Sequence, residues 1–401
     1  MIHTESVMGA TAVNQPARSR TRRHRLRTAV YILIALCLLV AGGMAGTGWY
    51  FSSQALQPVH DRVTYPLKVV AVRGSTVEVA QRDGSSITTS DDIARSATYR
   101  LQWQGGAITL GRVIASSAHG VVRQFTGSVQ GLKAGTSVHL DIFMYASPGA
   151  LRLSYRTIAL PDPLGAMPAW YVPGTSSTWA IYVHGRGMSR TEGLRSMSTL
   201  AAYGFPILDI SYRNDLGAPS SSDHVYHFGA TEWQDVQAAA RFALSHGARR
   251  LVLYGYSLGG SLVESFLHRS PDAGRVRAAI LDSPALDWNA ILDFRAGQQN
   301  VPGIITAIGK RFVAWRLGLG SLDDTNRLLP RVDFKVPTLL FQGTADTSVP
   351  YDRNITLARA QPRMVTLVVV PGAEHTQGWN TSPRLYTAML RTFISKRILN
   401  G

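Results

Sequence analysis

Ser257 stands in the segment of the chain best suited to covalent chemistry. Gly255-Tyr256-Ser257-Leu258-Gly259 places a serine between two glycines, after the apolar run Leu251–Tyr254 and before a stretch of helical pattern. A strand–turn–helix connection of this kind holds its serine exposed above a sheet, and the tight turn requires small residues on both sides. The motif predicts a nucleophilic serine. The alternative interpretation is a glycine-rich helix start in an ordinary parallel sheet.

A serine hydroxyl is a weak nucleophile unless a base that is held by a third group accepts its proton. Two later segments supply these groups. The apolar run Thr338–Phe341 leads into a turn that contains Asp346, and Thr366–Val370 leads into a turn that contains His375. Because parallel strands present their carboxyl ends at one edge of a sheet, we expect Ser257, Asp346 and His375 to lie together. Their chemistry would be acyl transfer from a carbonyl to the serine.

Two other acids compete with Asp346 for the role of orienting carboxylate. Glu374 directly precedes His375, and Asp282 ends the apolar run before Ser283-Pro284. Asp346 itself has a plainer interpretation as a turn-forming residue, since aspartate side chains often bind the backbone two residues on.

Acyl transfer also needs hydrogen-bond donors for the negatively charged oxygen of the tetrahedral intermediate. We expect the backbone N–H of Leu258 to be one donor and that of Arg186 to be the other. Arg186 lies in Val183-His184-Gly185-Arg186-Gly187, the loop after an earlier apolar run. His184 is interpreted as a residue that braces this loop. The Arg186 side chain is either solvated or placed to meet an anionic group of the substrate.

The pattern from about residue 150 onward predicts a mostly parallel sheet. Apolar runs at 179–183, 206–212, 251–254, 278–281, 338–341 and 366–370 alternate with helical patterns. Strands that are apolar throughout are covered by helices on both faces. One of the helices is predicted to begin at Thr231, with a capping box formed by Thr231 and Gln234, and to run to about His246.

Residues 67–149 have a different pattern of apolar and polar residues and are predicted to form a small β-rich domain. Short segments alternate between apolar and polar residues, and glycine-rich turns separate them. The segment contains no cluster of titratable groups that suggests chemistry. One interpretation of the segment is a binding module for a protein partner.

The N-terminal residues predict a signal-anchor. Residues 1–28 form a basic tail, residues 29–51 are free of charge and long enough to cross a bilayer, and residues 52–66 read as a polar linker. The basic flank should remain cytoplasmic, so that the rest of the chain lies outside the cell membrane. The competing interpretation is a cleaved signal peptide with residues 30–40 as its apolar core.

Composition excludes several classes of protein. Apolar residues make up 45% of the 401 residues and charged residues 16%, which is incompatible with a wholly disordered chain. The single cysteine, Cys37, excludes a disulfide framework. The net charge is +16. Six arginines lie before residue 28, and the remaining basic excess is spread thinly, without interleaved aromatic residues, so we expect no nucleic-acid partner. No metal-binding or cofactor motif is present, and we expect neither a metal nor a cofactor.

With these motifs in hand, residues from about 150 to 398 resemble the α/β-hydrolase superfamily, in particular the serine aminopeptidase and acylglycerol lipase-like branch, some of whose members are membrane anchored. The segments that carry the resemblance are His184-Gly-Arg-Gly, Ser211-Tyr-Arg-Asn-Asp, Gly255-Tyr-Ser-Leu-Gly-Gly, Gly343-Thr-Ala-Asp346 and Gly372-Ala-Glu-His375. The resemblance implies a doubly wound sheet with a helical cap, and a triad of Ser257, Asp346 and His375. It supplies no role for residues 67–145.

The cap would occupy residues 284–336, which are rich in Trp, Leu and Ile. These side chains either pack the cap onto the sheet or line an acyl-binding groove. On the second interpretation, the expected substrate is a small-molecule or lipid-like acyl ester. Three alternatives stay open. A peptidase would need acids for a free amine, with Glu232, Asp235 and Asp287 as candidates; an acyltransferase would use the same triad; a non-catalytic envelope binding protein would keep only the fold.

Overall fold

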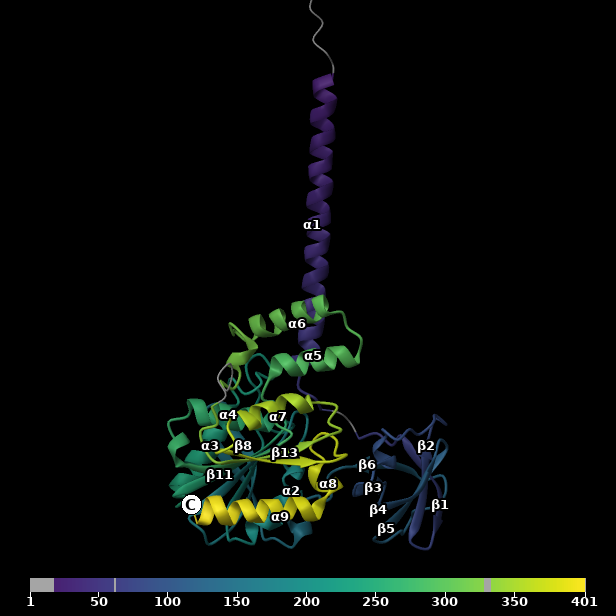
Figure 1. The fold of residues 1–401 in the computed structure, drawn as a ribbon, viewed down its shortest axis with the longest axis vertical. Helices are drawn as coiled ribbons and strands as arrows, with labels where there is room; N and C mark the ends of the chain where they lie inside the picture. Colours follow the sequence, from purple (N-terminus) through teal and green to yellow (C-terminus); the bar gives the residue numbers. More distant parts are fainter. Residues whose placement is uncertain (1–17, 61–62, 328–332, 401) are drawn as a thin grey trace, which may run out of the picture.

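The computed structural model describes residues 18–60, 63–327 and 333–400. Figure 1 shows a long N-terminal helix, a small barrel of strands and a larger body in which helices surround a sheet. This arrangement confirms the predicted fold class: an α/β-hydrolase fold preceded by a β-rich domain and one apolar N-terminal helix. Of the predicted basic tail, residues 1–17 lie outside the described residues.

Helix α1 (Arg18–Leu56) contains the predicted span 29–51 and is, within the described residues, the one helix long and apolar enough to cross a membrane. Its apolar side chains between Val30 and Met44 are exposed, as lipid-facing residues would be. The predicted linker of residues 52–66 begins later than expected. Residues 52–56 continue the helix because Ser52 and Leu56 are fully buried against the body of the protein.

The β-rich domain is a closed barrel with the strand order β1-β2-β5-β4-β3-β6, and all its neighbouring strands are antiparallel. Its strands are β1 (Leu67–Arg73), β2 (Thr76–Gln81), β3 (Tyr99–Trp103), β4 (Gly106–Ser117), β5 (Gly120–Thr126) and β6 (Ser137–Asp141). Alternating residues fill the interior, because successive side chains of a strand point to opposite faces.

Arg123 of β5 is buried in this barrel, and no carboxylate among the described residues pairs with it. Its guanidinium donates hydrogen bonds to four backbone carbonyls, those of Ile93, Arg95, Ala97 and Gly111. Burial lowers the pKa of Arg123 to about 10. The side chain therefore fixes the segment 93–97, which leaves the barrel toward the body of the protein.

The body is built on an eight-stranded sheet with the order β14-β13-β12-β11-β9-β10-β8-β7. Strand β8 is antiparallel to both of its neighbours, β7 and β10, and the other neighbouring strands are parallel. The strands are β7 (Arg156–Asp162), β8 (Gly165–Val172), β9 (Thr178–Val183), β10 (Ile207–Ile210), β11 (Arg250–Tyr256), β12 (Val276–Asp282), β13 (Thr338–Gly343) and β14 (Val365–Val370).

Helices cover both faces of this sheet and create two apolar cores. One core gathers side chains from α3 and α4, the other from α2 and α9, and Figure 1 places these helices on opposite sides of the strands. The helices are α2 (Leu194–Ala201), α3 (Trp233–Ser245), α4 (Leu258–Arg269), α7 (Tyr351–Ala360), α8 (Gly378–Thr381) and α9 (Pro383–Phe393).

The predicted capping box of α3 is wrong. The helix begins at Trp233, and the side chain of Thr231 has no hydrogen-bond partner. The physical reason is that Glu232 turns back and accepts hydrogen bonds from the backbone amides of His227 and Gly229, which fixes the chain entering the helix.

Helices α5 (Trp288–Gln298) and α6 (Gly303–Arg316) lie between β12 and β13, within the range expected for a cap. Figure 1 shows both helices beside the C-terminal end of α1, above the body that holds the sheet. The cap, the sheet and the first helix therefore meet in one region.

Candidate active site

Ser257 connects β11 to α4 and adopts a strained backbone conformation, with φ 48° and ψ −115°. Such a conformation costs about 1–3 kcal/mol for a residue with a side chain. The neighbouring glycines make the turn possible. A Cβ at Gly255 would lie 2.6 Å from the carbonyl oxygen of Gly259, and a Cβ at Gly259 would overlap the carbonyl oxygen of Val183. The pattern of small residues thus follows from backbone-to-backbone contact, as the sequence predicted.

His375 contacts both of the other predicted triad residues. Its Nε2 lies 2.8 Å from the Ser257 Oγ, and its Nδ1 lies 2.9 Å and 3.1 Å from the two carboxylate oxygens of Asp346. His375 follows β14 and Asp346 follows β13, so the carboxyl ends of neighbouring parallel strands bring them together. The arrangement allows His375 to take a proton from Ser257 while Asp346 holds the imidazole.

Asp346 is held in place by several donors. The backbone amides of Ser348 and Val349 donate to its Oδ1, and the Gln342 side chain donates to its Oδ2. Burial alone would raise the pKa of Asp346, but the His375 imidazole and the two amides outweigh burial, so the pKa lies below its ordinary value. The carboxylate is therefore ionised at neutral pH.

Burial acts on His375 in the opposite sense and lowers its pKa, because it disfavours the charged imidazolium. The charge and hydrogen bond of Asp346 outweigh burial, and the net result is a pKa above the ordinary value. The pair thus stabilises the protonated imidazole that forms when the serine loses its proton.

The two competing acids are engaged elsewhere. Asp282 is buried, accepts a hydrogen bond from the Tyr386 hydroxyl at 2.8 Å, and has its pKa raised by burial to about 6. Glu374 accepts hydrogen bonds from the backbone amide and hydroxyl of Thr347. Within the described residues, Asp346 is the carboxylate that contacts the His375 ring.

The loop after β9 lies directly against Ser257. A Cβ at Gly185 would lie 3.1 Å from the Ser257 Cβ, a crowded contact that glycine avoids. Leu258 is the first residue of α4, and amides in the first turn of a helix have no acceptor within the helix. The two predicted oxyanion residues, Leu258 and Arg186, therefore lie on the two segments that border the serine.

Two buried acids that sequence reasoning missed hold this loop. Glu192 accepts the Gly185 N–H at 2.7 Å, and Asp215 contacts His184 Nε2 at 2.8 Å. Burial lowers the pKa of His184, but the Asp215 carboxylate outweighs it and the pKa rises to about 9. His184 Nδ1 lies 2.9 Å from the Gly185 carbonyl, as expected of a residue that braces the loop.

The sequence left two alternatives open for the Arg186 side chain, solvation or an anionic substrate group, and the structure adds a contact with the N-terminal helix. Arg186 Nη2 donates to the backbone carbonyls of Gln54 and Gln57, at 3.1 Å and 2.9 Å, at the C-terminal end of α1. The loop beside the serine is thereby tied to the N-terminal helix.

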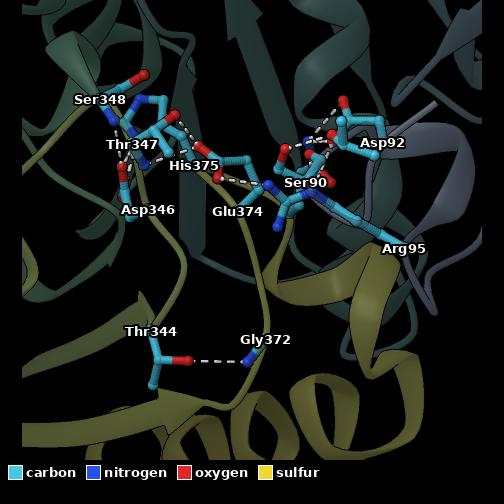
Figure 2. A network of polar contacts seen from close by, with 12 residues as sticks. Ser90, Asp92, Arg95, Thr344, Asp346, Thr347, Ser348, Gly372, Glu374 and His375 are labelled. Atoms are coloured by element: carbon cyan, nitrogen blue, oxygen red, sulfur yellow. Dashed lines mark hydrogen bonds and ion pairs between the residues drawn. The ribbon is translucent and has the colours of Figure 1, made fainter. Parts of the chain in front are cut away.

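The barrel also reaches the site, which no sequence signal indicated. Arg95 Nη2 lies 3.3 Å from Glu374 Oε2, and Glu374 in turn binds Thr347, the neighbour of Asp346. Figure 2 shows this chain of contacts, with Glu374 between Arg95 on one side and Thr347 on the other. The Tyr99 hydroxyl donates to Gln377 at 2.8 Å. The barrel is thus docked on the loops that carry His375 and Asp346.

The three acids considered as ligands of a substrate amine bind other groups of the protein. Glu232 binds backbone amides, Asp235 pairs with Arg213, and Asp287 caps α5 by accepting the Ala290 amide at 3.0 Å. Among the described residues, no group of three or more His, Cys, Asp or Glu side chains is arranged to hold a metal ion.

A cavity of about 550 Å³ opens beside Ser257 and His375. This volume lies in the range of ~300–1,000 Å³ that is usual for ligand pockets. Its apolar lining includes Phe228, Trp288 and Val313, and its charged lining residues are Arg186, Arg295 and Lys310. Among the described residues that line it, none is an aspartate or a glutamate.

The fold and this constellation define a serine hydrolase of the α/β-hydrolase superfamily. Residues 196–398 match the model of the prolyl oligopeptidase family, and the chain belongs to that family.

Individual proteins that resemble this chain share less than a quarter of its residues over the aligned segments. The uncharacterized protein YfhR of Escherichia coli (strain K12) is 23% identical over 221 residues, which are 52% of this chain and 69% of YfhR. The Pyrococcus furiosus esterase Pf2001 superposes with a TM-score of 0.50 in one crystal form and 0.51 in another, at 18% and 17% identity. The superpositions cover 63% of this chain and 97% and 95% of the esterase. At this identity the likeness concerns the fold.

Proposed function

We propose that the protein is a membrane-anchored, extracytoplasmic serine hydrolase that cleaves a carboxylic ester through an acyl-enzyme. The single observation that carries this proposal is the contact of 2.8 Å between Ser257 Oγ and His375 Nε2, with Asp346 on the far side of the imidazole. A serine that is hydrogen-bonded to an oriented histidine is an activated nucleophile.

In the proposed mechanism, Ser257 Oγ attacks the ester carbonyl while His375 Nε2 takes the hydroxyl proton. The backbone amides of Leu258 and Arg186 donate to the oxyanion of the tetrahedral intermediate. The carbon–oxygen bond to the alcohol then breaks, and His375 returns the proton to the departing alkoxide. Water attacks the acyl-enzyme by the reverse sequence and releases the carboxylic acid and Ser257.

The anchor proposed for residues 29–51 is supported by α1, whose length and apolar surface suit a bilayer. The arginines before residue 28 favour a cytoplasmic N-terminus, because cytoplasmic flanks carry the excess of basic residues. The catalytic body, which follows the helix, would then lie outside the cytoplasmic membrane.

Cavity charge favours an ester over a substrate with a free amino group. The family is named for peptidases, and an aminopeptidase needs a carboxylate to hold the substrate amine. Here the described charged residues of the cavity lining are Arg186, Arg295 and Lys310, which would repel an ammonium group.

The test compares an acyl ester with an aminoacyl amide of matched size. We expect p-nitrophenyl butyrate to be cleaved with a kcat/KM well above that of alanine p-nitroanilide. Ser257→Ala should abolish both activities, while Ser198→Ala, a matched change on the exposed face of α2, should not. Faster cleavage of the amide would overturn the ester assignment. Formation of a new ester when an alcohol is added would identify an acyltransferase.

A further inference from the structure

The membrane helix forms part of the wall of the cavity beside Ser257. Phe51, Gln54 and Ala55, from the last two turns of α1, line it together with residues of α5 and α6. The proposed anchor is therefore more than a tether, because the shape of the substrate cavity depends on it.

The end of α1 is built into the catalytic body. Leu56 is fully buried in the larger apolar core, and its carbonyl accepts the Tyr226 amide at 2.8 Å. On the cap side, Arg316 of α6 donates to the hydroxyls of Ser52 and Ser53 at 3.0 Å and 2.9 Å. These contacts fix the helix relative to the cap.

Helices α1 and α6 cross at close range. A Cβ at Gly48 would overlap the Phe312 ring, and a Cβ at Gly309 would lie 3.3 Å from the Phe51 Cβ. One glycine on each helix thus lets the two backbones approach. The Arg316 guanidinium lies 4.4 Å from the centre of the Trp49 ring, so α6 lies at the level where the predicted span ends.

The outer surface of α6 carries two exposed large apolar side chains, one near each end of the helix, with the exposed Arg311 between them. Ile304 and Trp315 of α6 are 72% and 67% exposed. Trp49 and Tyr50 of α1 are also exposed, and Trp49 contacts Arg316 of α6. Tryptophan and tyrosine gather where hydrocarbon meets headgroups. Figure 1 shows α6 lying across α1 at the top of the body, the orientation in which a helix rests on a membrane surface.

We propose that the cavity is an acyl-chain site filled from the membrane, and that its substrate is a carboxylic ester of a long-chain acid residing in the adjacent leaflet. This inference rests on the proposed hydrolase function. The acyl chain lies between α1, α5 and α6 and presents its carbonyl to Ser257. The Oγ–acyl bond forms and the bond to the alcohol breaks, with His375 delivering the proton to the alcohol. Water then releases the long-chain acid.

The test narrows the cavity from the α1 side in the full-length protein reconstituted in phosphatidylcholine vesicles. Ala55→Trp should lower the ratio of kcat/KM for p-nitrophenyl palmitate to that for p-nitrophenyl butyrate by at least roughly tenfold, since each excluded methylene costs about fourfold in binding. Leu292→Trp, which fills the same cavity from α5, should lower the ratio in the same sense. Ala45→Trp, a matched change on the exposed part of α1, should leave the ratio unchanged.

The outcomes distinguish a failure of the acyl-chain site from a failure of the proposed hydrolase function. An unchanged ratio in both cavity variants would overturn the acyl-chain site while butyrate cleavage upheld the hydrolase. Wild-type protein that cleaved neither ester and did not react with a fluorophosphonate would overturn the hydrolase itself. If Ala55→Trp failed to fold, the Leu292→Trp ratio would decide.

Discussion

The Arg95 guanidinium of the barrel lies 3.3 Å from the carboxylate of Glu374, the residue that precedes His375 in the chain. Both side chains are mostly buried, and Glu374 also binds Thr347 beside Asp346. The barrel therefore braces two loops of the triad at once. This contact gives the accessory domain a role that its own sequence did not suggest.

Removing this brace should reduce turnover without changing substrate binding. We expect Arg95→Ala to lower kcat roughly fivefold, equivalent to about 1 kcal/mol, with KM nearly constant, because the loops of Asp346 and His375 lose a partner. Arg95→Lys should restore part of the rate. Arg112→Ala, an exposed change in the same barrel, serves as the control. Equal kcat values for Arg95→Ala and the wild type would contradict the brace.

The pH profile should report the Asp346–His375 pair. Only neutral His375 accepts the serine proton, so kcat/KM should fall as the pH drops through its pKa. Since Asp346 raises that pKa, the acid limb should have its midpoint above the ordinary value of about 6.5.

Asp346→Asn tests the same pair. The amide cannot stabilise the imidazolium, so the midpoint should move to lower pH and kcat should fall by roughly ten-thousand-fold. Steady-state rates between pH 5 and 9 measure both effects. A midpoint that stayed in place in the variant would exclude Asp346 as the cause of the raised pKa.

The glycines around Ser257 should be intolerant of any side chain. In Gly259→Ala the new methyl group would overlap the Val183 carbonyl, so we expect a loss of activity and a destabilisation of about 1–3 kcal/mol. Gly274→Ala is the matched control, because a Cβ at that position has no neighbour within 4 Å. Denaturant unfolding of both variants measures the difference, and equal stabilities would contradict the packing argument.

The Arg186 side chain offers a separate test of the link between the loop and α1. Arg186→Ala keeps the backbone amide but removes the donors to the Gln54 and Gln57 carbonyls. We expect kcat to fall less than the roughly 100- to 1,000-fold typical of losing an oxyanion donor, because that donor remains. A fall of that full size would show that the side chain itself acts on the intermediate.

The sequence predicted the sheet and the neighbourhood of the triad because both depend on local patterns. An apolar strand followed by a glycine turn, an aspartate or a histidine places that group at the carboxyl edge of a parallel sheet. Glu192, Asp215 and Arg95 could not be found in this way, since each acts through a partner that only the fold brings near. The Thr231 cap failed for a local reason, because Glu232 accepts hydrogen bonds from backbone amides of the preceding turn.

The packing of the C-terminal end of α1 against the body also could not be predicted from the sequence. Its apolar span is evident from composition. The burial of Ser52 depends on the contact with α6, and that of Leu56 depends on the apolar core of the catalytic body. A polar stretch after a membrane span reads as a linker unless the surface that covers it is known.

The most direct measurement of the central claim is fluorophosphonate labelling of the full-length protein, followed by mass spectrometry of the modified residue. The reagent reports an activated serine and needs no knowledge of the substrate. We predict a single stoichiometric adduct on Ser257 that is absent from Ser257→Ala and much slower to form in His375→Ala. A folded wild-type protein without an adduct at Ser257 would contradict the claim that this serine, held by His375 and Asp346, is the nucleophile.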